Sequence, residues 1–252
     1  MHDQIRLLEE LSANAWPPAV TQVVDGWLLR YASGVSRRAN SVLALSGSEA
    51  GDFEARARVV EEFYRRRGLP ARFHLSPAVS PTDLDQFLEE RGYRFDCPTA
   101  VQAVDLPELQ RRLPEGLEQS VELSRVPDED WFRVYYTAHL WDVVDQEVRR
   151  GILTRIGPRV AFATLRRDGE PVAVGQGVVE RGWLGLFSMS THPDHRRQGA
   201  ATQLVQALTV WGEKFGAAGA YLQVMEESSA ARELYRKLGF ETRYHYHYRE
   251  QT

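Results

Sequence analysis

Apolar residues recur along this chain with two periods, and these periods separate predicted helices from predicted strands. In residues 200–215 the apolar positions follow an i, i+4, i+7, i+11 spacing, which predicts a helix with one face on a sheet. They are Leu204, Leu208, Trp211 and Phe215. Residues 220–224 and 240–249 predict strands, and residues 229–238 predict a second helix that ends at Gly239.

The preceding hundred or so residues carry a similar alternation of elements. Turn sequences at residues 167–169 and 180–182 each contain glycine and separate runs of strand-forming residues. The predicted strands are residues 120–124, 160–165, 171–179 and 183–190, and the predicted helices are 128–136 and 145–152. The order over residues 118–250 is therefore β-α-α-β-β-β-α-β-α-β, a mixed α/β arrangement.

Residues 189–202 join a predicted strand to a predicted helix through a short, arginine-bearing loop. Glycine and alanine at the helix start let a backbone approach a ligand closely, and the free N–H groups there favour a phosphate. This pattern predicts a pyrophosphate cradle, although the loop alone also fits an arginine-rich cap on an ordinary helix. The candidate residues are Met189, Ser190, Thr191, Arg196, Arg197, Gln198, Gly199, Ala200, Ala201 and Thr202.

Two spaced motifs carry a resemblance to a known family. The pattern R-x-x-G-x-A, with Arg196, Gly199 and Ala201, resembles motif A of the GNAT superfamily of acyl-CoA-dependent N-acyltransferases. Downstream, residues 228–240 are similar to the family segment N-x-x-A-x-x-x-Y-x-x-x-G-F, with Tyr235 at the tyrosine position. Ser228 replaces the usual asparagine, and its hydroxyl can still donate one hydrogen bond to the pantetheine arm of the cofactor.

The amino-terminal part resembles the second half in weakened form. Residues 87–93 match residues 234–240 as a helix end closed by glycine and an aromatic residue, but Leu88 stands where the second half has Tyr235. The expected fold class is therefore α/β (α+β), with tandem GNAT-like domains that each hold a mixed, mainly antiparallel sheet flanked by helices. We expect a degenerate domain over residues 1–106, a linker at 107–117 and a catalytic domain over 118–252.

The resemblance implies a direct attack of an amine on the thioester of acetyl-CoA, with no covalent enzyme intermediate. Backbone N–H groups of residues 189–191 are expected to hold the thioester carbonyl. Tyr235 stands at the general-acid position of the family, where its phenol can protonate the leaving thiolate. Glu226 is the candidate base; Glu227 competes with it, and both also fit the description of solvated loop acids.

Composition narrows the functional classes. The chain has 252 residues and a net charge of -4, which gives no support to nucleic-acid binding. The single cysteine, Cys97, is incompatible with an intrachain disulfide, and no apolar run is long enough to span a bilayer, so a cytoplasmic protein without a membrane partner is expected. His245 and His247 share one strand face without an evident third ligand, so no metal is expected.

The acceptor side of the site is less defined. An aromatic cluster is interpreted as part core and part cleft wall, which favours a small-molecule or peptide amine with some apolar character. Its members are Trp131, Tyr135, Tyr136, His139 and Trp141. Arg37, Arg38 and Asn40 either bind an anionic group of the acceptor or form a solvated hairpin with an ordinary hydrogen-bonding asparagine, and the second interpretation is preferred. The alternative function is a non-enzymatic acyl-CoA-binding or regulatory module; a monomer and a homodimer both remain open.

Overall fold

The computed structural model describes residues 2–46, 53–114, 121–139 and 141–252. These residues form two compact units whose boundaries interleave along the chain. The first unit comprises Met1–Val101, Met225–Glu227 and Arg243–Thr252, and the second comprises Gln102–Val224 and Ser228–Thr242. Within the described ranges, every helix is too short or too polar to cross a membrane.

The second unit contains a run of antiparallel strands with one parallel strand at its end. Strands β6 to β9 pair in chain order, and β10 then pairs with β9 in parallel. Their bounds are β6 (Val121–Ser124), β7 (Arg159–Arg167), β8 (Glu170–Glu180), β9 (Trp183–Thr191) and β10 (Gly219–Met225). The two turns flanking β8 have positive φ at both central residues (Asp168 and Gly169, then Arg181 and Gly182), the geometry that suits two-residue hairpins.

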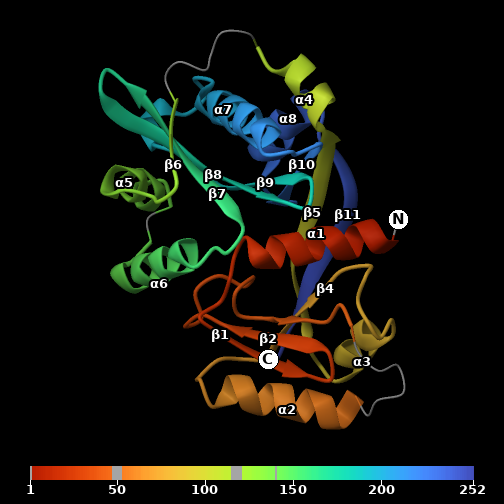
Figure 1. Cartoon of the computed structure of the whole chain (residues 1–252). Helices are drawn as coiled ribbons and strands as arrows, with labels where there is room; N and C mark the ends of the chain where they lie inside the picture. The colour runs from red at the N-terminus through yellow and green to blue at the C-terminus, as the bar shows by residue number, and fades with distance from the viewer. Residues whose placement is uncertain (1, 47–52, 115–120, 140) are drawn as a thin grey trace. The chain divides into compact units, whose positions relative to one another are not determined.

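Helices lie on both sides of these strands. The α7 side chain of Leu208 lies 2.9 Å from the position that a Cβ on Gly177 would take, so α7 packs tightly on that face. On the other face the α5 side chain of Trp131 packs edge-on against Phe162, and Figure 1 shows α5 and α7 on opposite sides of β7 and β8. The helices are α4 (Leu106–Arg112), α5 (Glu129–Thr137), α6 (Val143–Thr154), α7 (Ala200–Lys214) and α8 (Ser229–Lys237).

The element order predicted for residues 118–250 is confirmed, with most boundaries within two residues. Helix α4 occupies residues 106–112 and so takes up the first part of the predicted linker at 107–117, while residues 115–120 lie outside the described residues. The predicted division into domains and linker stays a prediction. Pro107 stands in the first turn of α4, where a helix tolerates proline. Leu109 is 0% exposed and anchors this helix in the fold.

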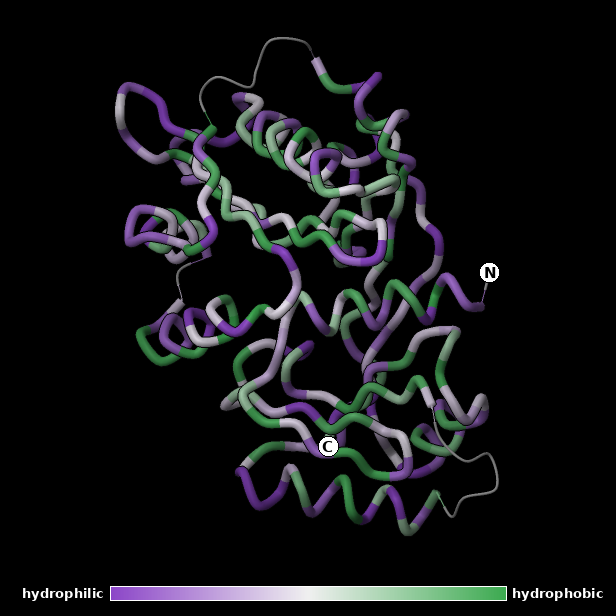
Figure 2. The backbone as a smooth tube through the Cα atoms, viewed as in Figure 1, coloured by the Kyte–Doolittle hydropathy of each residue, from purple (hydrophilic) through white to green (hydrophobic). Residues whose placement is uncertain are grey.

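The first unit begins with α1 (His2–Asn14), followed by the antiparallel strands β1 (Val20–Val24), β2 (Trp27–Tyr31) and β3 (Val42–Leu43). Helix α2 (Phe53–Arg65) leads to β4 (Arg72–Leu75), which pairs with β3 in parallel. Hydrophobic and hydrophilic residues interleave along α2, as an amphipathic helix requires (Figure 2). After α3 (Leu84–Glu90) and β5 (Arg94–Asp105), the unit is completed by the last strand, β11 (Glu241–Glu250), which pairs antiparallel with β4.

Sequence patterns missed two strands of this part of the chain. The first is β1, whose residues are mostly exposed and show little hydrophobic alternation. The second is β5, which contains Pro98, a residue that lacks a backbone donor. Residues 243–252 also cluster with the first unit, whereas the predicted division places them with the second half.

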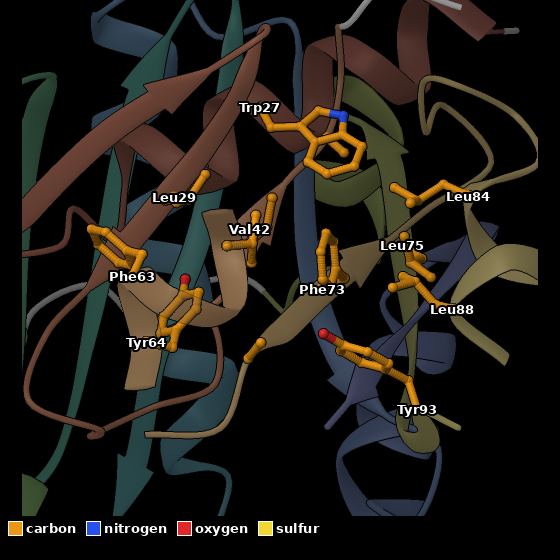
Figure 3. Packing of buried hydrophobic residues seen from close by; sticks show 13 residues of the cluster. Trp27, Leu29, Val42, Phe63, Tyr64, Phe73, Leu75, Leu84, Leu88 and Tyr93 are labelled. Atoms are coloured by element: carbon orange, nitrogen blue, oxygen red, sulfur yellow. The ribbon is translucent and has the colours of Figure 1, made fainter. Parts of the chain in front are cut away.

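Aromatic rings form the core of the first unit (Figure 3). Phe73 on β4 meets Trp27 and Tyr93 edge-on, with ring centroids 5.5 Å and 5.7 Å away. The Trp27 indole donates a hydrogen bond to the Ser80 carbonyl oxygen at 3.1 Å, so its polar atom is satisfied. Leu88 is fully buried in this core, which accounts for an aliphatic residue at that position.

Helix ends in the two units have the same hydrogen-bond pattern. After α3, the Tyr93 N–H donates to the Leu88 carbonyl oxygen at 2.9 Å, and after α8 the Phe240 N–H donates to the Tyr235 carbonyl oxygen at 3.0 Å. The glycine between each pair, Gly92 or Gly239, has φ of +87°. Glycine is favoured there because this conformation strains other residues.

Candidate active site

Strand β9 contains a bulge near its carboxyl end. Its register with β8 pairs Ser190 with Val174 and Phe187 with Gln176, so Ser188 and Met189 lie opposite the single residue Gly175. Ser188 has φ of +53°, and its hydroxyl donates to the Gln176 side-chain oxygen at 3.2 Å. A bulge of this kind interrupts the ladder and turns backbone N–H groups out of their usual pairing.

The Met189 side chain fills the space beside the glycine opposite the bulge. A Cβ on Gly175 would lie 2.6 Å from the Met189 sulfur. Strands β9 and β10 pair from Trp183 opposite Gly219 to Leu186 opposite Leu222. The bulge begins just beyond this paired stretch. The carboxyl end of β9 is thus a site where backbone groups can face a ligand.

The start of α7 supplies the second part of the site. Gly199 has φ of +77°, and the Gln203 N–H makes the first intrahelical bond, to the Gly199 carbonyl oxygen at 3.2 Å. By helix geometry, the N–H groups of Ala200, Ala201 and Thr202 precede that bond and have no acceptor within α7. Three donors at the positive end of a 15-residue helix suit an anion such as a phosphate.

The bulge and the helix start meet in one cavity of about 440 Å³. Nine of the ten predicted cradle residues line it, and Gln198 does not. The lining residues are Ala138, His139, Met189, Ser190, Thr191, His195, Arg196, Arg197, Gly199, Ala200, Ala201, Thr202, Ala230, Ala231 and Leu234. The motif at residues 196–201 and the helix around Ala231 therefore line the same cavity.

Side chains of the cradle loop mostly hold the loop itself. Gln198 accepts a hydrogen bond from Arg167 through its side-chain oxygen, and its carbonyl oxygen accepts a second at 2.8 Å. The His192 ring nitrogen caps the short helix at Pro193–His195 by accepting from the Asp194 N–H at 3.4 Å. These bonds fix the loop backbone, so that the N–H groups of the following helix are held in place.

Tyr235 lies on α8 and is 8% exposed, with its ring edge-on to Phe240. Burial raises the pKa of its phenol to about 12, so the hydroxyl keeps its proton at neutral pH. Tyr235 is not among the residues that line the cavity, although Leu234, its neighbour on α8, is. Ser228 caps α8 without a hydrogen bond from its side chain to the helix, and it is also not part of the lining.

Glu226 belongs to the first compact unit. Its carboxylate lies 3.3 Å from His245 Nε2, and both side chains are about half exposed. Its backbone N–H donates to the Pro98 carbonyl oxygen at 3.1 Å. Its role as a base stays a prediction.

A histidine that the sequence placed only in the cleft wall is close to the bulge. His139 Nε2 lies 3.0 Å from the Ser190 hydroxyl oxygen, and both residues line the cavity. Desolvation and the positive charges of Arg149 and Arg196 lower the pKa of His139 to about 4. No sequence spacing could have indicated this pair, because 51 positions separate its members.

The remaining candidates have structural partners. Asn40 is 1% exposed; its side-chain oxygen accepts from the N–H groups of Ala32 and Gly34, and its amide donates to the Val35 carbonyl oxygen at 2.7 Å. This agrees with the preferred interpretation of a hydrogen-bonding asparagine. Arg37 forms an ion pair with Asp96 at 2.6 Å.

His247 of β11 and the members of the aromatic cluster also have defined surroundings. His247 stacks on Phe95 and lies 3.2 Å from Asp85. Trp131 and Tyr135 are buried, whereas His139 lines the cavity, so the cluster is part core and part cleft wall as expected.

Comparison with known proteins gives consistent matches over the whole chain. The family described as "Probable histone acetyltransferase Rv0428c C-terminal" matches residues 2–249. The chain is 32% identical over 247 residues to "Uncharacterized N-acetyltransferase YobR" of Bacillus subtilis, covering 98% of each chain.

Two solved structures share the fold at low sequence identity. A GCN5-related N-acetyltransferase from Kribbella flavida superposes with a TM-score of 0.72 at 17% identity, covering 98% of this chain and 95% of that chain. A tandem GNAT protein from the clavulanic acid biosynthesis pathway gives a TM-score of 0.64 at 14% identity, covering 99% and 95%.

Proposed function

The chain belongs to the GNAT family of N-acetyltransferases and is an acyltransferase, and on that premise we propose that it moves an acetyl group from acetyl-CoA to an amine. The acceptor is a small molecule, an amino acid or a peptide. The observation that carries the proposal is the single cavity shared by the β9 bulge and the amino-terminal N–H groups of α7.

The residues present suit acetyl-CoA. Backbone N–H groups at the start of α7 can hold its pyrophosphate, with Arg196 and Arg197 at the same mouth adding positive charge. Gly199 has open space where a side chain would lie, so a phosphate can approach the backbone. When bound, acetyl-CoA supplies an activated thioester carbonyl and a thiolate leaving group. The backbone of residues 189–191 would polarise that carbonyl by hydrogen bonding.

Tyr235 is the proposed general acid. Its raised pKa, about 12, keeps the phenol protonated, which is the state an acid must have before it donates. Ala231 lies one turn before Tyr235 on the same face of α8 and lines the cavity, which supports a role of Tyr235 at the cofactor sulfur. Ser228, at the start of the same helix, is proposed to donate a hydrogen bond to the pantetheine arm.

The first unit is proposed to be a degenerate GNAT-like domain. The matching helix ends at Gly92 and Gly239 support a common origin, as does the parallel pairing of β3 with β4 and of β9 with β10 across a helix. Leu88, buried at the position of Tyr235, cannot donate a proton. One active site per chain follows from this.

The proposal is tested by acetyl-CoA binding and turnover in two matched glycine variants. Gly199→Ala and Gly169→Ala both place a side chain at positive φ with open space around it, which costs about 1–2 kcal/mol in each case. Only Gly199 belongs to the cradle, so calorimetry should detect weaker acetyl-CoA binding in that variant alone. The wild-type protein should release CoA thiol with amines from a panel. Binding without release across amino acids, polyamines, aminoglycosides and lysine peptides would contradict acetyl transfer.

A further inference from the structure

His139 and Ser190 form a polar pair at the carboxyl end of β9. Nε2 of the imidazole and Oγ of the serine are 3.0 Å apart, a hydrogen-bond distance, and both residues line the cavity that holds the cradle. Ser190 is 5% exposed, so its hydroxyl has few solvent partners and is oriented by the histidine. It lies next to Met189, at the bulge proposed to polarise the thioester carbonyl.

Two aromatic rings contact the imidazole, and two arginines lie close enough to act on its charge. Trp141 stacks on it with ring centroids 4.2 Å apart and planes 7° apart. The Arg149 guanidinium of α6 lies 3.6 Å from the Trp141 ring centroid, and Tyr135 of α5 meets the imidazole edge-on at 5.8 Å. The Arg196 guanidinium lies beside the same segment and donates to the Ala138 carbonyl oxygen at 3.1 Å. The two ring contacts orient the imidazole, and desolvation with the two cations keeps it neutral before the reaction, so Nε2 has a lone pair that can accept a proton.

A neutral imidazole can act as a proton acceptor. Through a hydrogen-bonded serine it can accept a proton from a group that it does not itself contact. Because Oγ of Ser190 lies at the bulge, a hydrogen bond from an amine there would bring the nitrogen close to the proposed carbonyl site. This placement rests on the proposed function of the cavity. It concerns removal of the amine proton, the step for which the sequence offered Glu226, with Glu227 as a competitor.

We propose that Ser190 and His139 form a relay that removes the proton of the acceptor amine. As the C–N bond forms at the acetyl carbonyl carbon and the C–S bond breaks, the amine gives a proton to Ser190 Oγ, which passes its own proton to His139 Nε2. The sulfur electron pair takes a proton from Tyr235, and His139 and Tyr235 return to their starting states through solvent. The net change is one amide and one thiol formed from one amine and one thioester. His139 is thus a positioning and proton-accepting residue that acts through Ser190.

The pair is tested first without reference to activity. Nitrogen NMR of labelled imidazole in the full chain should report His139 as neutral at pH 7, with its Nε2 resonance shifted in Ser190→Ala. An unmoved resonance in Ser190→Ala, or a His139 pKa at or above the ordinary value of 6.5, would overturn the pairing and the relay with it.

Kinetics then test the role of the pair. His139→Ala and Ser190→Ala should each lower kcat by about 10²-fold or more, the range of general-base catalysis, while calorimetric acetyl-CoA affinity stays within about twofold. Added imidazole should restore part of the rate to His139→Ala, because the vacated side chain lines an open cavity, and it should not accelerate the wild type. A packing role alone would give no rescue, and full turnover in His139→Ala would overturn the relay.

The relay and the proposed function fail in different ways. If the wild type binds acetyl-CoA and acetylates an amine but the two variants do so at the wild-type rate, the relay is wrong and the proposed function stands. If the wild type transfers acetyl to none of the amines, both are overturned, even where NMR detects the hydrogen-bonded pair.

Discussion

The Arg196 guanidinium donates a hydrogen bond from Nη2 to the Ala138 carbonyl oxygen at 3.1 Å, across 58 positions of the chain. Its Nε approaches the Thr191 carbonyl oxygen at 3.5 Å. One side chain therefore ties the cradle loop to the end of β9 and to the segment that carries His139. Arg196 is therefore a structural connection, in addition to the phosphate-binding role proposed for it.

Replacing Arg196 should change the protonation of His139. Arg196→Ala removes one of the two cations that, with desolvation, lower the pKa of His139 to about 4, so this pKa should rise toward the ordinary value of 6.5. Histidine NMR titration measures the shift. Arg181→Ala, in the turn between β8 and β9, removes the same charge elsewhere and should leave the titration of His139 unchanged.

Tyr235→Phe should reduce turnover far more than acetyl-CoA binding. The change removes one oxygen atom and keeps the ring packed against Phe240, so kcat should fall by about 10²-fold or more. Steady-state kinetics and calorimetry measure the two effects. Since burial raises the pKa of Tyr235 to about 12, the wild-type rate should show no loss from this group near pH 10. An unchanged kcat would remove the acid role.

Gly175→Ala should disturb the bulge. The added Cβ would lie 2.6 Å from the Met189 sulfur, so the flexible Met189 side chain must move within the cavity lining, at a cost of about 1 kcal/mol in the free energy of unfolding. Acetyl-CoA binding should weaken with it. Gly157→Ala, where no atom lies within 4 Å of the new Cβ, is the matched control and should leave both quantities near the wild-type values. Equal denaturant midpoints for the two variants would argue against a tight contact at Gly175.

A buried acid–base pair in the first unit should make the protein sensitive to acid. His74 Nε2 lies 2.7 Å from Glu9, and Tyr244 donates to the same carboxylate at 2.7 Å. Burial lowers the pKa of His74 below 6.5, with Glu9 offsetting part of the effect. Burial alone would raise the pKa of Glu9, but the contacts with His74 and Tyr244 outweigh it and lower that pKa.

The lowered pKa values of His74 and Glu9 both make the folded state less stable in acid. Below pH 6.5 the unfolded chain protonates His74 while the folded chain resists, so the free energy of unfolding should fall by up to about 1.4 kcal/mol per pH unit. The contribution of Glu9 is present above its unfolded pKa, 4.5, and is lost as the pH falls through its lower folded pKa. Denaturant titrations from pH 8 to 5 measure this slope. His74→Gln should flatten it, and His245→Gln, an exposed histidine, should not.

The second half of the chain was predictable because its signals are local. Helix α7 follows from four apolar residues on one face, and the hairpins around β8 follow from turns with glycine at positive φ. Strand β1 was missed because its residues are exposed and its pairing with β2, not its own pattern, makes it a strand. The membership of residues 243–252 in the first unit depends on pairing with β4, far away in sequence.

The sequence by itself determined the strand, the R-x-x-G-x-A loop and the helix start of the proposed cradle, because these segments are contiguous and their geometry follows from backbone conformation and helix N–H groups. It also determined which tyrosine to test, through the motif that ends at Gly239 and Phe240. Only the tertiary structure decided that His139 meets Ser190 and that burial holds the proton on Tyr235. Hydrogen bonding between distant residues and desolvation depend on what packs around a side chain, and packing of that kind leaves no fixed spacing in a single sequence.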